Sequence, residues 1–314
     1  MKFAVETWSP EYGVSVENGG LDVSTAPVDP NIELPASSWA PIAAADSAAV
    51  ARPARVLFID GVRRVDARVW IDDGAGSSVP GLCATVAAGA VCVEPARAHL
   101  EAAIVARGVF SSAPSLVAID TKWATYEPRF VADGSPEGLI LGVQERMATL
   151  EKQIAGAAGA AELSIIDGPL RGREHVCGAV GYIKTQHVRY LPDALQAVVG
   201  TLEAGERTPL FCVGGAFTRL SWYVRLPGVR AHALSGIVRC ELSGDRSVDD
   251  ARRVAGAVTA LLPRFASTSH KDTRAPQNLY PIAGLERQLR RRLGDPQFME
   301  RALRAAAAAN GSSR

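Results

Sequence analysis

Apolar residues along the chain form short runs that predict strands, and several of these runs end in aspartate. RVLFIDG predicts a strand from residue 55 to Asp60, and VDARVWIDDG alternates in a way that predicts a second strand. Because only a few residues separate the two runs, they predict an antiparallel hairpin. GLCATVAAGAVCVE predicts a third strand or a broken pair, residues 96–107 predict a short helix, and SLVAIDTKW predicts a strand ending at Asp120.

The middle of the chain changes to a helical period. The apolar residues between 136 and 157 fall on one stripe, which comprises Leu139, Val143, Met147, Leu150 and Ile154. Ser135 followed by Pro136 is a typical helix start. AELSIIDGPL predicts the next strand, ending at Asp167, and VCGAVGYIK predicts one ending at Lys184. Further strands are expected in PLFCVGG, SWYVRLP and GIVRCELSG, and helices at 193–203, in VDDARRVAGAVTALLPRF, in LERQLRRRLGD and in FMERALRAAAAA.

This order of elements predicts an α/β fold on a mixed sheet flanked by helices. Three antiparallel strands followed by a helix and a strand is also the order of a ribonuclease H-like fold. We expect an irregular N-terminal arm over residues 1–50, with a hairpin in FAVETW and YGVSVEN followed by a Pro/Ala/Ser-rich linker. One domain is expected over 51–304 and a disordered tail over 305–314.

Two apolar strands carry the same ending, FIDG at 58–61 and IIDGPL at 165–170. If they are neighbours, Asp60 and Asp167 would bring two carboxylates together at the edge of a sheet. Like charges at short range repel unless a cation lies between them, and carboxylates are the ligands that hard divalent cations prefer. The alternative is that each Asp-Gly merely begins a turn.

The predicted helix and the following strands supply further candidates. At 100° per residue, Glu151 lies about 80° from the centre of the apolar stripe, whereas Glu145 lies about 160° away. Glu151 is therefore the candidate third carboxylate, and its alternative is a surface position beside Lys152. Candidate phosphate contacts are Lys184, Arg225, Arg63 and Arg64. Arg239 and Glu241 share a strand face and form either an intrastrand ion pair or a functional pair.

Composition excludes several classes of protein without choosing a function. No apolar run among the 314 residues reaches the length of a membrane span, and the N-terminus lacks the apolar core of a signal peptide, so we expect a cytoplasmic protein. The five cysteines form no CxxC pair, and the histidines show no metal-ligand spacing. The P-loop, the GxGxxG fingerprint and the GxSxG elbow are absent from the sequence. The net charge is only +1, although 29 of the 34 basic residues are arginines.

Taken together, these motifs resemble the NurA nucleases, a family with a ribonuclease H-like core. The resemblance extends over about residues 55–290 and consists of six short pieces in order: FIDG, ERMATLEKQ with Arg146 and Glu151, IIDGPL, GYIK, WYVRLP and RCE. The family pattern ends in a Pro-containing segment and an Ala-His that completes the metal site. Here Ala283 and Gly284 occupy that place in APQNLYPIAGLERQL, so Tyr280 and Glu286 are the polar groups nearby.

The resemblance implies a manganese-dependent nuclease, with magnesium as the other suitable metal, that acts on DNA ends. Family members form dimers and work with the hexameric ATPase HerA in end resection, and this chain has no ATPase motif of its own. Asp60, Glu151 and Asp167 would hold the metal, Lys184 would act with them, and Arg225 and Tyr280 would meet the substrate. Two alternatives remain open: a catalytically impaired adaptor that dimerises and docks the ATPase, and an unrelated α/β domain.

Overall fold

The computed structural model describes residues 22–44, 53–72, 77–159, 161–185, 188–215 and 217–311. The chain divides into two compact units. Unit 1 comprises residues 1–58, 92–98 and 160–283, and unit 2 comprises residues 59–91, 99–159 and 284–314. Each unit is therefore assembled from three separated stretches of chain. The hairpin predicted for FAVETW and YGVSVEN lies outside the described residues.

Unit 1 is built on a mixed sheet. Its strands follow the spatial order β2 (Val28–Asp29), β13 (Phe211–Val213), β14 (Arg219–Arg225), β15 (Ile237–Ser243), β10 (Ala179–Ile183) and β9 (Leu163–Asp167). β9 and β10 are parallel, whereas β10, β15, β14, β13 and β2 pair antiparallel. Four short strands complete the unit: β12 (Glu206–Arg207) with β3 (Ile42–Ala43), and β1 (Asp22–Val23) with β11 (Val188–Arg189).

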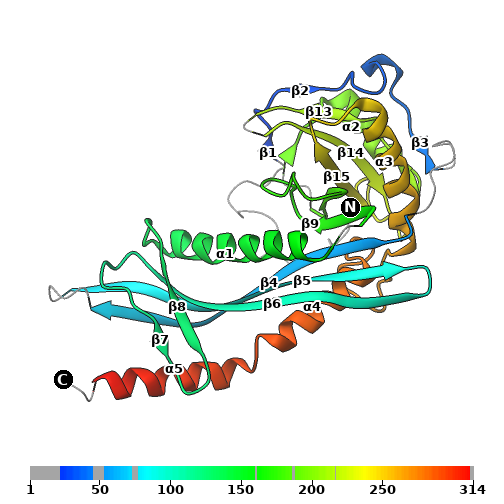
Figure 1. Cartoon of the computed structure of the whole chain (residues 1–314). Coiled ribbons are helices and arrows are strands. Elements are labelled where there is room, and N and C mark those ends of the chain that lie inside the picture. Colours follow the sequence, from blue (N-terminus) through cyan, green and yellow to red (C-terminus); the bar gives the residue numbers. More distant parts are fainter. Residues whose placement is uncertain are drawn as a thin grey trace. The chain divides into compact units, whose positions relative to one another are not determined.

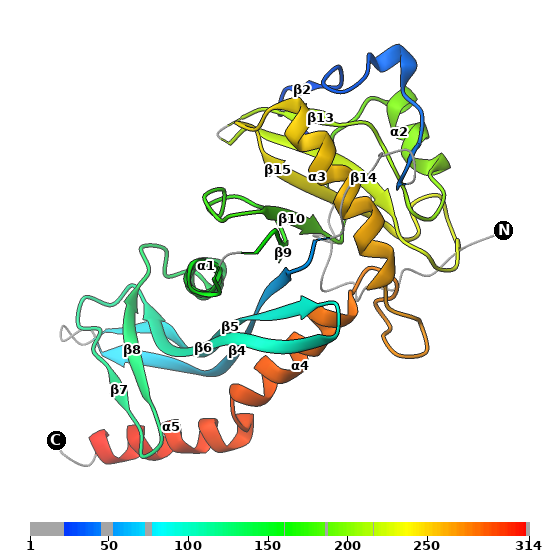
Figure 2. The same ribbon diagram turned by 45° about the vertical axis from the view of Figure 1, so that its right-hand side comes forward.

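Alternation along β14 directs its side chains into two cores, one on each face of the sheet. Trp222 packs in a core with Ala255 and Val258 of α3 (Val248–Leu261), which lies along the sheet in Figure 2. The next residue, Tyr223, packs in another core with Val199 of α2 (Asp193–Thr201). Because successive strand residues point to opposite faces, the two helices cover opposite faces of the sheet.

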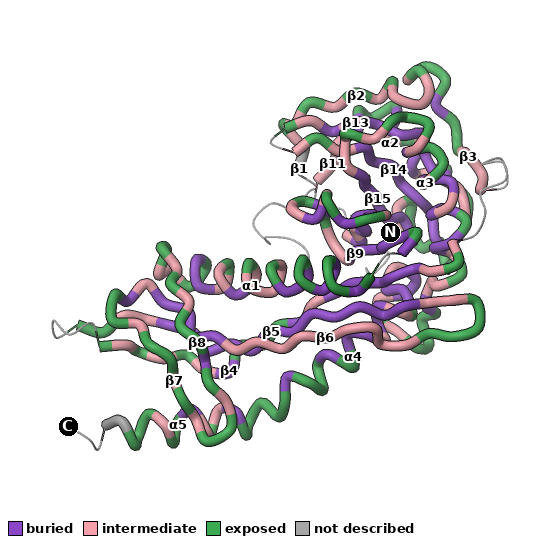
Figure 3. Tube along the Cα trace, viewed as in Figure 1, coloured by how far each residue is buried: buried purple, intermediate pink, exposed green. Residues whose placement is uncertain are grey.

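Unit 2 contains a second set of neighbouring strands. Their order is β4 (Val56–Asp72), β5 (Ser78–Glu94), β6 (Arg97–Ser111), β8 (Thr125–Phe130) and β7 (Ile119–Asp120). Figure 1 shows α1 (Pro136–Ala157) along one face, and α5 (Pro296–Gly311) beyond the other. β5 is buried along most of its length, as Figure 3 shows, because both of its faces are covered. The predicted fold class, an α/β fold with a mixed sheet flanked by helices, is confirmed in both units.

The helix predicted over residues 136–157 is confirmed as α1. The hydroxyl of Ser135 accepts a hydrogen bond from the backbone N–H of Gly138, as an N-cap residue does. The orientation predicted from the helical period is also confirmed, because Glu151 is buried whereas Glu145 is exposed.

Two predictions in the first half of the chain are wrong. Asp60 does not end a strand, because β4 continues without a break for 17 residues, from Val56 to Asp72. Gly61 keeps an extended conformation there, and the alternating residues after it prolong the strand. Residues 96–107 are not helical, because all of them except residue 96 belong to β6. Their alanines favour a helix intrinsically, but pairing with the neighbouring strands outweighs such a weak local preference.

Three other segments differ in extent from their predictions. The strand predicted in SLVAIDTKW is reduced to β7, two residues long, and β8 was not predicted. The Pro/Ala/Ser-rich segment supplies the strands β2 and β3, and it buries Trp39. The tail predicted as disordered is helical as far as Gly311, where an alanine run prolongs α5. No helix in the described part of the chain is long and apolar enough to cross a membrane.

Candidate metal centre

Two carboxylates of unit 2 meet where β4 passes α4 (Tyr280–Arg292). Asp60 and Glu286 are both buried, and one carboxylate oxygen of each lies within 4.8 Å of the other. Like charges at this range repel each other, and a divalent cation between them would remove that repulsion. Because hard divalent cations take oxygen ligands, this donor set fits magnesium, manganese or calcium.

Glu151 reaches β4 at the residue after Asp60. A Cβ atom added to Gly61 would lie 2.5 Å from Glu151 Oε1 and 2.8 Å from Met147 Cγ, so only glycine leaves room for them. The N–H of Gly61 also donates a hydrogen bond to Asp60 Oδ1 at 2.7 Å. The Asp-Gly pair therefore serves close packing within a strand here, and not a turn.

We expect Gly61→Ala to destabilise the protein by disrupting the packing of Glu151 and Met147 against β4. The added methyl group must displace the carboxylate of Glu151 or the side chain of Met147, and overpacking of this kind typically costs about 1–3 kcal/mol. The free energy of unfolding, measured in urea, should fall by this amount. Gly156→Ala on α1 is the matched control, because an added Cβ there meets nothing within 4 Å. A Gly61→Ala protein as stable as the parent would contradict this close packing.

Asp167 lies in a polar chain of contacts within unit 1. The ammonium of Lys184 donates to Asp167 Oδ2 at 2.6 Å and to Asn278 Oδ1 at 3.0 Å. The amide of Asn278 in turn donates to Asp272 Oδ2 at 2.6 Å. Lys184 is thus paired with Asp167, and the catalytic role predicted for it stays a prediction, whereas sequence reasoning missed Asn278. The only signal for Asn278 was its place in APQNLYP, two residues before the noted Tyr280.

A buried ionic cluster holds the backbone that follows Asp167. Glu241 accepts a hydrogen bond from the N–H of Leu170 at 2.6 Å, and its other oxygen pairs with Arg239 at 2.6 Å and with Arg219 at 3.2 Å. Both guanidinium groups also lie over the ring of Tyr190. Arg239 and Glu241 therefore form the intrastrand ion pair that was one of the two expectations from sequence.

The contacts of two predicted phosphate-binding arginines are structural. Arg64 bonds to Asp66 at 2.6 Å and to the carbonyl groups of Leu293 and Gly294 at the end of α4. Asp66 also accepts hydrogen bonds from the hydroxyls of Thr85 and Tyr126, so Arg64 belongs to a buried network.

The guanidinium of Arg225 donates to the carbonyls of Gly200, Leu202, Ala233 and Ser235. Burial lowers the pKa of Arg225, with a smaller contribution from the charge of Arg230. Two other predicted substrate contacts, Arg63 and Tyr280, differ from these arginines, because their side chains reach the surface. Arg63 is exposed on β4, and the hydroxyl of Tyr280 shares a hydrogen bond with Thr268 at 2.8 Å.

We expect Arg225→Gln to affect stability and not substrate binding. Glutamine cannot reach all four carbonyl groups, and a buried acceptor without a donor costs about 1–3 kcal/mol. The free energy of unfolding should fall by at least this amount, while the apparent KM for DNA at a permissive temperature stays unchanged. A raised KM with unchanged stability would restore the sequence-based prediction of a substrate contact.

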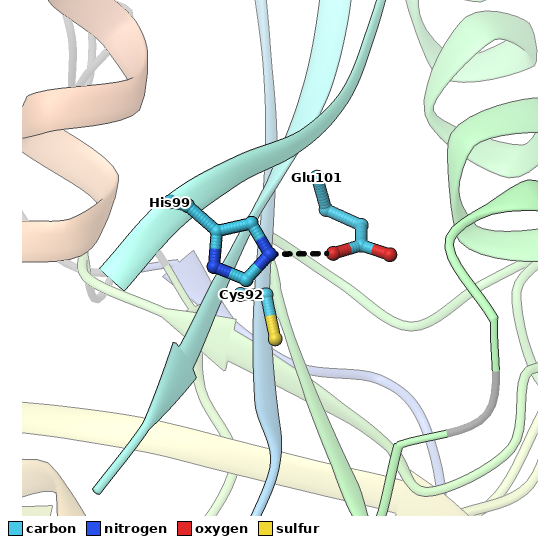
Figure 4. Close-up of side chains that lie close together, drawn as sticks. All are labelled: Cys92, His99 and Glu101. Atoms are coloured by element: carbon cyan, nitrogen blue, oxygen red, sulfur yellow. Dashed lines mark hydrogen bonds and ion pairs between the residues drawn. The ribbon is translucent and has the colours of Figure 1, made fainter. Parts of the chain in front are cut away.

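His99 and Glu101 are further potential metal ligands. His99 Nε2 and Glu101 Oε2 on β6 are 3.0 Å apart, because residues two apart share a strand face. A dashed line marks this contact in Figure 4. The five cysteines are free thiols, and burial raises the pKa of Cys83 to about 12, with a smaller contribution from the charge of Asp66. Cys83 is therefore unsuited to act as a nucleophile.

The fold and the site together define an α/β protein with a buried carboxylate pair suited to a divalent cation. No protein-family model matches the chain, and a comparison with curated proteins found no match. Among solved structures, the chain is similar to the NurA nuclease from Sulfolobus solfataricus, with 11% identity and a TM-score of 0.49 over 88% of this chain and 86% of that chain. It is also similar to the catalytic domain of human Endonuclease V, with 15% identity and a TM-score of 0.31 over 77% of this chain and 85% of that chain.

Proposed function

We propose that this protein is a metal-dependent nuclease that hydrolyses phosphodiester bonds in DNA. The observation that carries the proposal is the buried pair of carboxylates, Asp60 and Glu286, within 4.8 Å of each other. A metal-dependent nuclease uses carboxylates of this kind to hold a divalent cation against the phosphate. The order of the motifs along the sequence supports the same function independently.

Asp60 and Glu286 would hold the cation, and Glu151 of α1, which packs against Gly61 beside Asp60, would take part. Asp167 is proposed as a further ligand from its place in the second Asp-Gly motif. A bound cation would supply activation of water and stabilisation of the charge that develops on the phosphate. Lys184 would orient Asp167, to which it donates a hydrogen bond, and its ammonium would balance phosphate charge. Glu286 would take the role of the absent histidine.

The substrate and partners of this proposal follow from the resemblance to the NurA family. The protein would act on DNA ends in repair, with manganese or magnesium, as a cytoplasmic homodimer that works with a HerA-type hexameric ATPase. Exposed arginines on α4 directly after Glu286 support a polyanionic substrate; they are Arg287, Arg290, Arg291 and Arg292. Those in the last turn also complement the dipole of the helix.

The experiment is a cleavage assay with linear single- and double-stranded DNA in manganese and in magnesium. We expect cleavage that depends on the metal and stops on chelation. The second candidate function is that of a catalytically impaired adaptor, which is favoured by Ala283-Gly284 in place of Ala-His. A calorimetric manganese titration distinguishes this adaptor from the nuclease. An absence of both metal binding and cleavage, together with intact association with the ATPase, would favour the adaptor.

A further inference from the structure

Unit 2 contains two arginines that face each other across α1 and β8. A Cβ atom at Gly142 of α1 would lie 2.7 Å from Val131 Cγ2, so this part of the helix packs directly on Val131, the residue that follows β8. Arg146 lies four residues after Gly142, on the same side of the helix and about 6 Å along its axis. Arg129 lies within β8, two residues before Val131, which corresponds to about 6.6 Å along extended chain.

A second contact places Arg129 on the face of the sheet that α1 covers. β8 pairs in parallel with β6, with Phe110 opposite Arg129. A Cβ atom at Gly108 would lie 3.1 Å from Arg129 Cγ, and one at Gly142 would lie 3.5 Å from Phe110 Cδ1. The side chains of Arg129 and Arg146 therefore converge between the strand and the helix.

Among the described residues, neither arginine has a hydrogen-bond or ion-pair partner that accounts for its position. The Nε atoms of Arg129 and Arg146 are buried and, within the described part of the chain, have no hydrogen-bond acceptor. Both side chains are half-buried, so solvent still reaches them. Burial, followed by the charge of Arg129, lowers the pKa of Arg146, as expected for two like charges placed together. An anion between the two guanidinium groups would remove the repulsion and satisfy their donors.

We propose that Arg129 and Arg146 form a binding site for one phosphate group of the DNA backbone. Arg146 precedes Glu151 by five residues, which corresponds to about 7.5 Å along α1 and about 140° around its axis. The phosphate held by the two arginines would therefore be a different one from the phosphate at the carboxylates. The site would hold it without regard to sequence, because a contact to phosphate reads no base. This inference rests on the proposed function for the identity of its ligand.

The test is equilibrium binding of fluorescently labelled single- and double-stranded DNA to the full chain, measured by anisotropy in chelator so that cleavage is absent. Arg129→Gln and Arg146→Gln should each weaken binding on the order of tenfold, equally for different sequences. The dependence of log K on log salt should lose a slope of about 0.9 per arginine for duplex DNA and about 0.7 for single strands. Arg129→Lys and Arg146→Lys should recover part of the affinity, because they keep the charge but lose the planar fork.

Arg304→Gln is the matched control, because Arg304 is an exposed arginine of the same unit whose guanidinium is already paired with Glu300. It should leave the affinity and the salt slope unchanged. Both Gln variants at the facing arginines should melt at or above the temperature of the parent protein, since each removes a like charge, so weaker binding would not reflect unfolding.

Parent-like affinity and slope in both Gln variants would overturn the phosphate site, and so would a parent protein that fails to bind DNA in chelator. The cleavage assay is separate from the binding assay, so failure of the phosphate site can be distinguished from failure of the proposed nuclease activity. Weaker binding in the variants of a protein that does not cleave DNA would support the phosphate site and contradict the nuclease. Cleavage of DNA by the parent protein, together with unaffected binding in the variants, would support the nuclease and contradict the phosphate site.

Discussion

Asp60→Asn is expected to abolish metal-dependent cleavage of DNA and to lower kcat by well over 100-fold. Asparagine keeps the size of the side chain and one carbonyl oxygen, but it removes the negative charge that a divalent cation requires. Loss of an outer-shell partner alone costs about 10–100-fold in metal affinity or activity, and loss of a ligand should cost more. Manganese affinity, measured by calorimetric titration, should fall in parallel with the rate of cleavage.

The comparison needs a carboxylate that is not part of the site. Glu145→Gln provides it, because Glu145 is on α1 like Glu151 but is exposed. It should cleave DNA at the rate of the parent. Glu286→Gln should resemble Asp60→Asn if Glu286 replaces the absent histidine. If Asp60→Asn cleaves DNA at the parent rate, the proposed metal centre is wrong.

Arg207→Met is expected to give the largest loss of stability, about 3–5 kcal/mol in the free energy of unfolding. Arg207 binds both carboxylate oxygens of Glu33, at 2.7 and 2.8 Å, and both side chains are only 3% exposed. Glu33 also accepts a hydrogen bond from the N–H of Leu210 at 2.9 Å. Removal of one partner leaves the other charge buried, and this costs more than the pair itself contributes.

Urea denaturation measures this loss, and Arg253→Met is its control. Arg253 also pairs with a carboxylate, that of Asp250, but its side chain is 65% exposed. Exposed pairs contribute about 0–1 kcal/mol, so the control should unfold almost like the parent. Glu33 lies in the segment 22–44, and its pair with Arg207 attaches that segment to β12. An equally small effect of Arg207→Met would show that this attachment does not stabilise the protein.

The same pair predicts a dependence of stability on pH. Burial acts to raise the pKa of Glu33, but the hydrogen bond and charge of Arg207, with the N–H of Leu210 and the charge of Arg252, bring it below the usual 4.5. A carboxylate whose pKa is lower in the folded state contributes stability above its unfolded pKa. That contribution is therefore present in full above about pH 4.5 and is lost as the pH falls through the lower folded pKa. Glu33→Gln should lack this acid-dependent loss in urea melts between pH 3 and pH 6.

The sequence by itself determined the elements whose pattern is local and strong. The apolar stripe and the cap at Ser135 were sufficient to place α1, because a helix is stabilised by contacts between residues three and four apart. The same arithmetic chose Glu151 over Glu145. The strands before Asp167 and before Lys184 were also recognised, since runs of buried β-branched residues are typical of central strands.

Only the tertiary structure decided which groups Asp60 and Glu286 approach and which arginines have structural contacts. An Asp-Gly pair looks the same in a turn and in a continuous strand, and the packing of Met147 and Glu151 over Gly61 requires the strand. Arg64 and Arg225 looked like phosphate contacts in the sequence but donate to backbone carbonyl groups of the protein. Arg129 and Arg146, which belong to separate elements, converge. The approach of Glu286 to Asp60 spans more than 220 positions of sequence. Contacts between distant residues depend on the packing of whole elements, and no local pattern of residues encodes that packing.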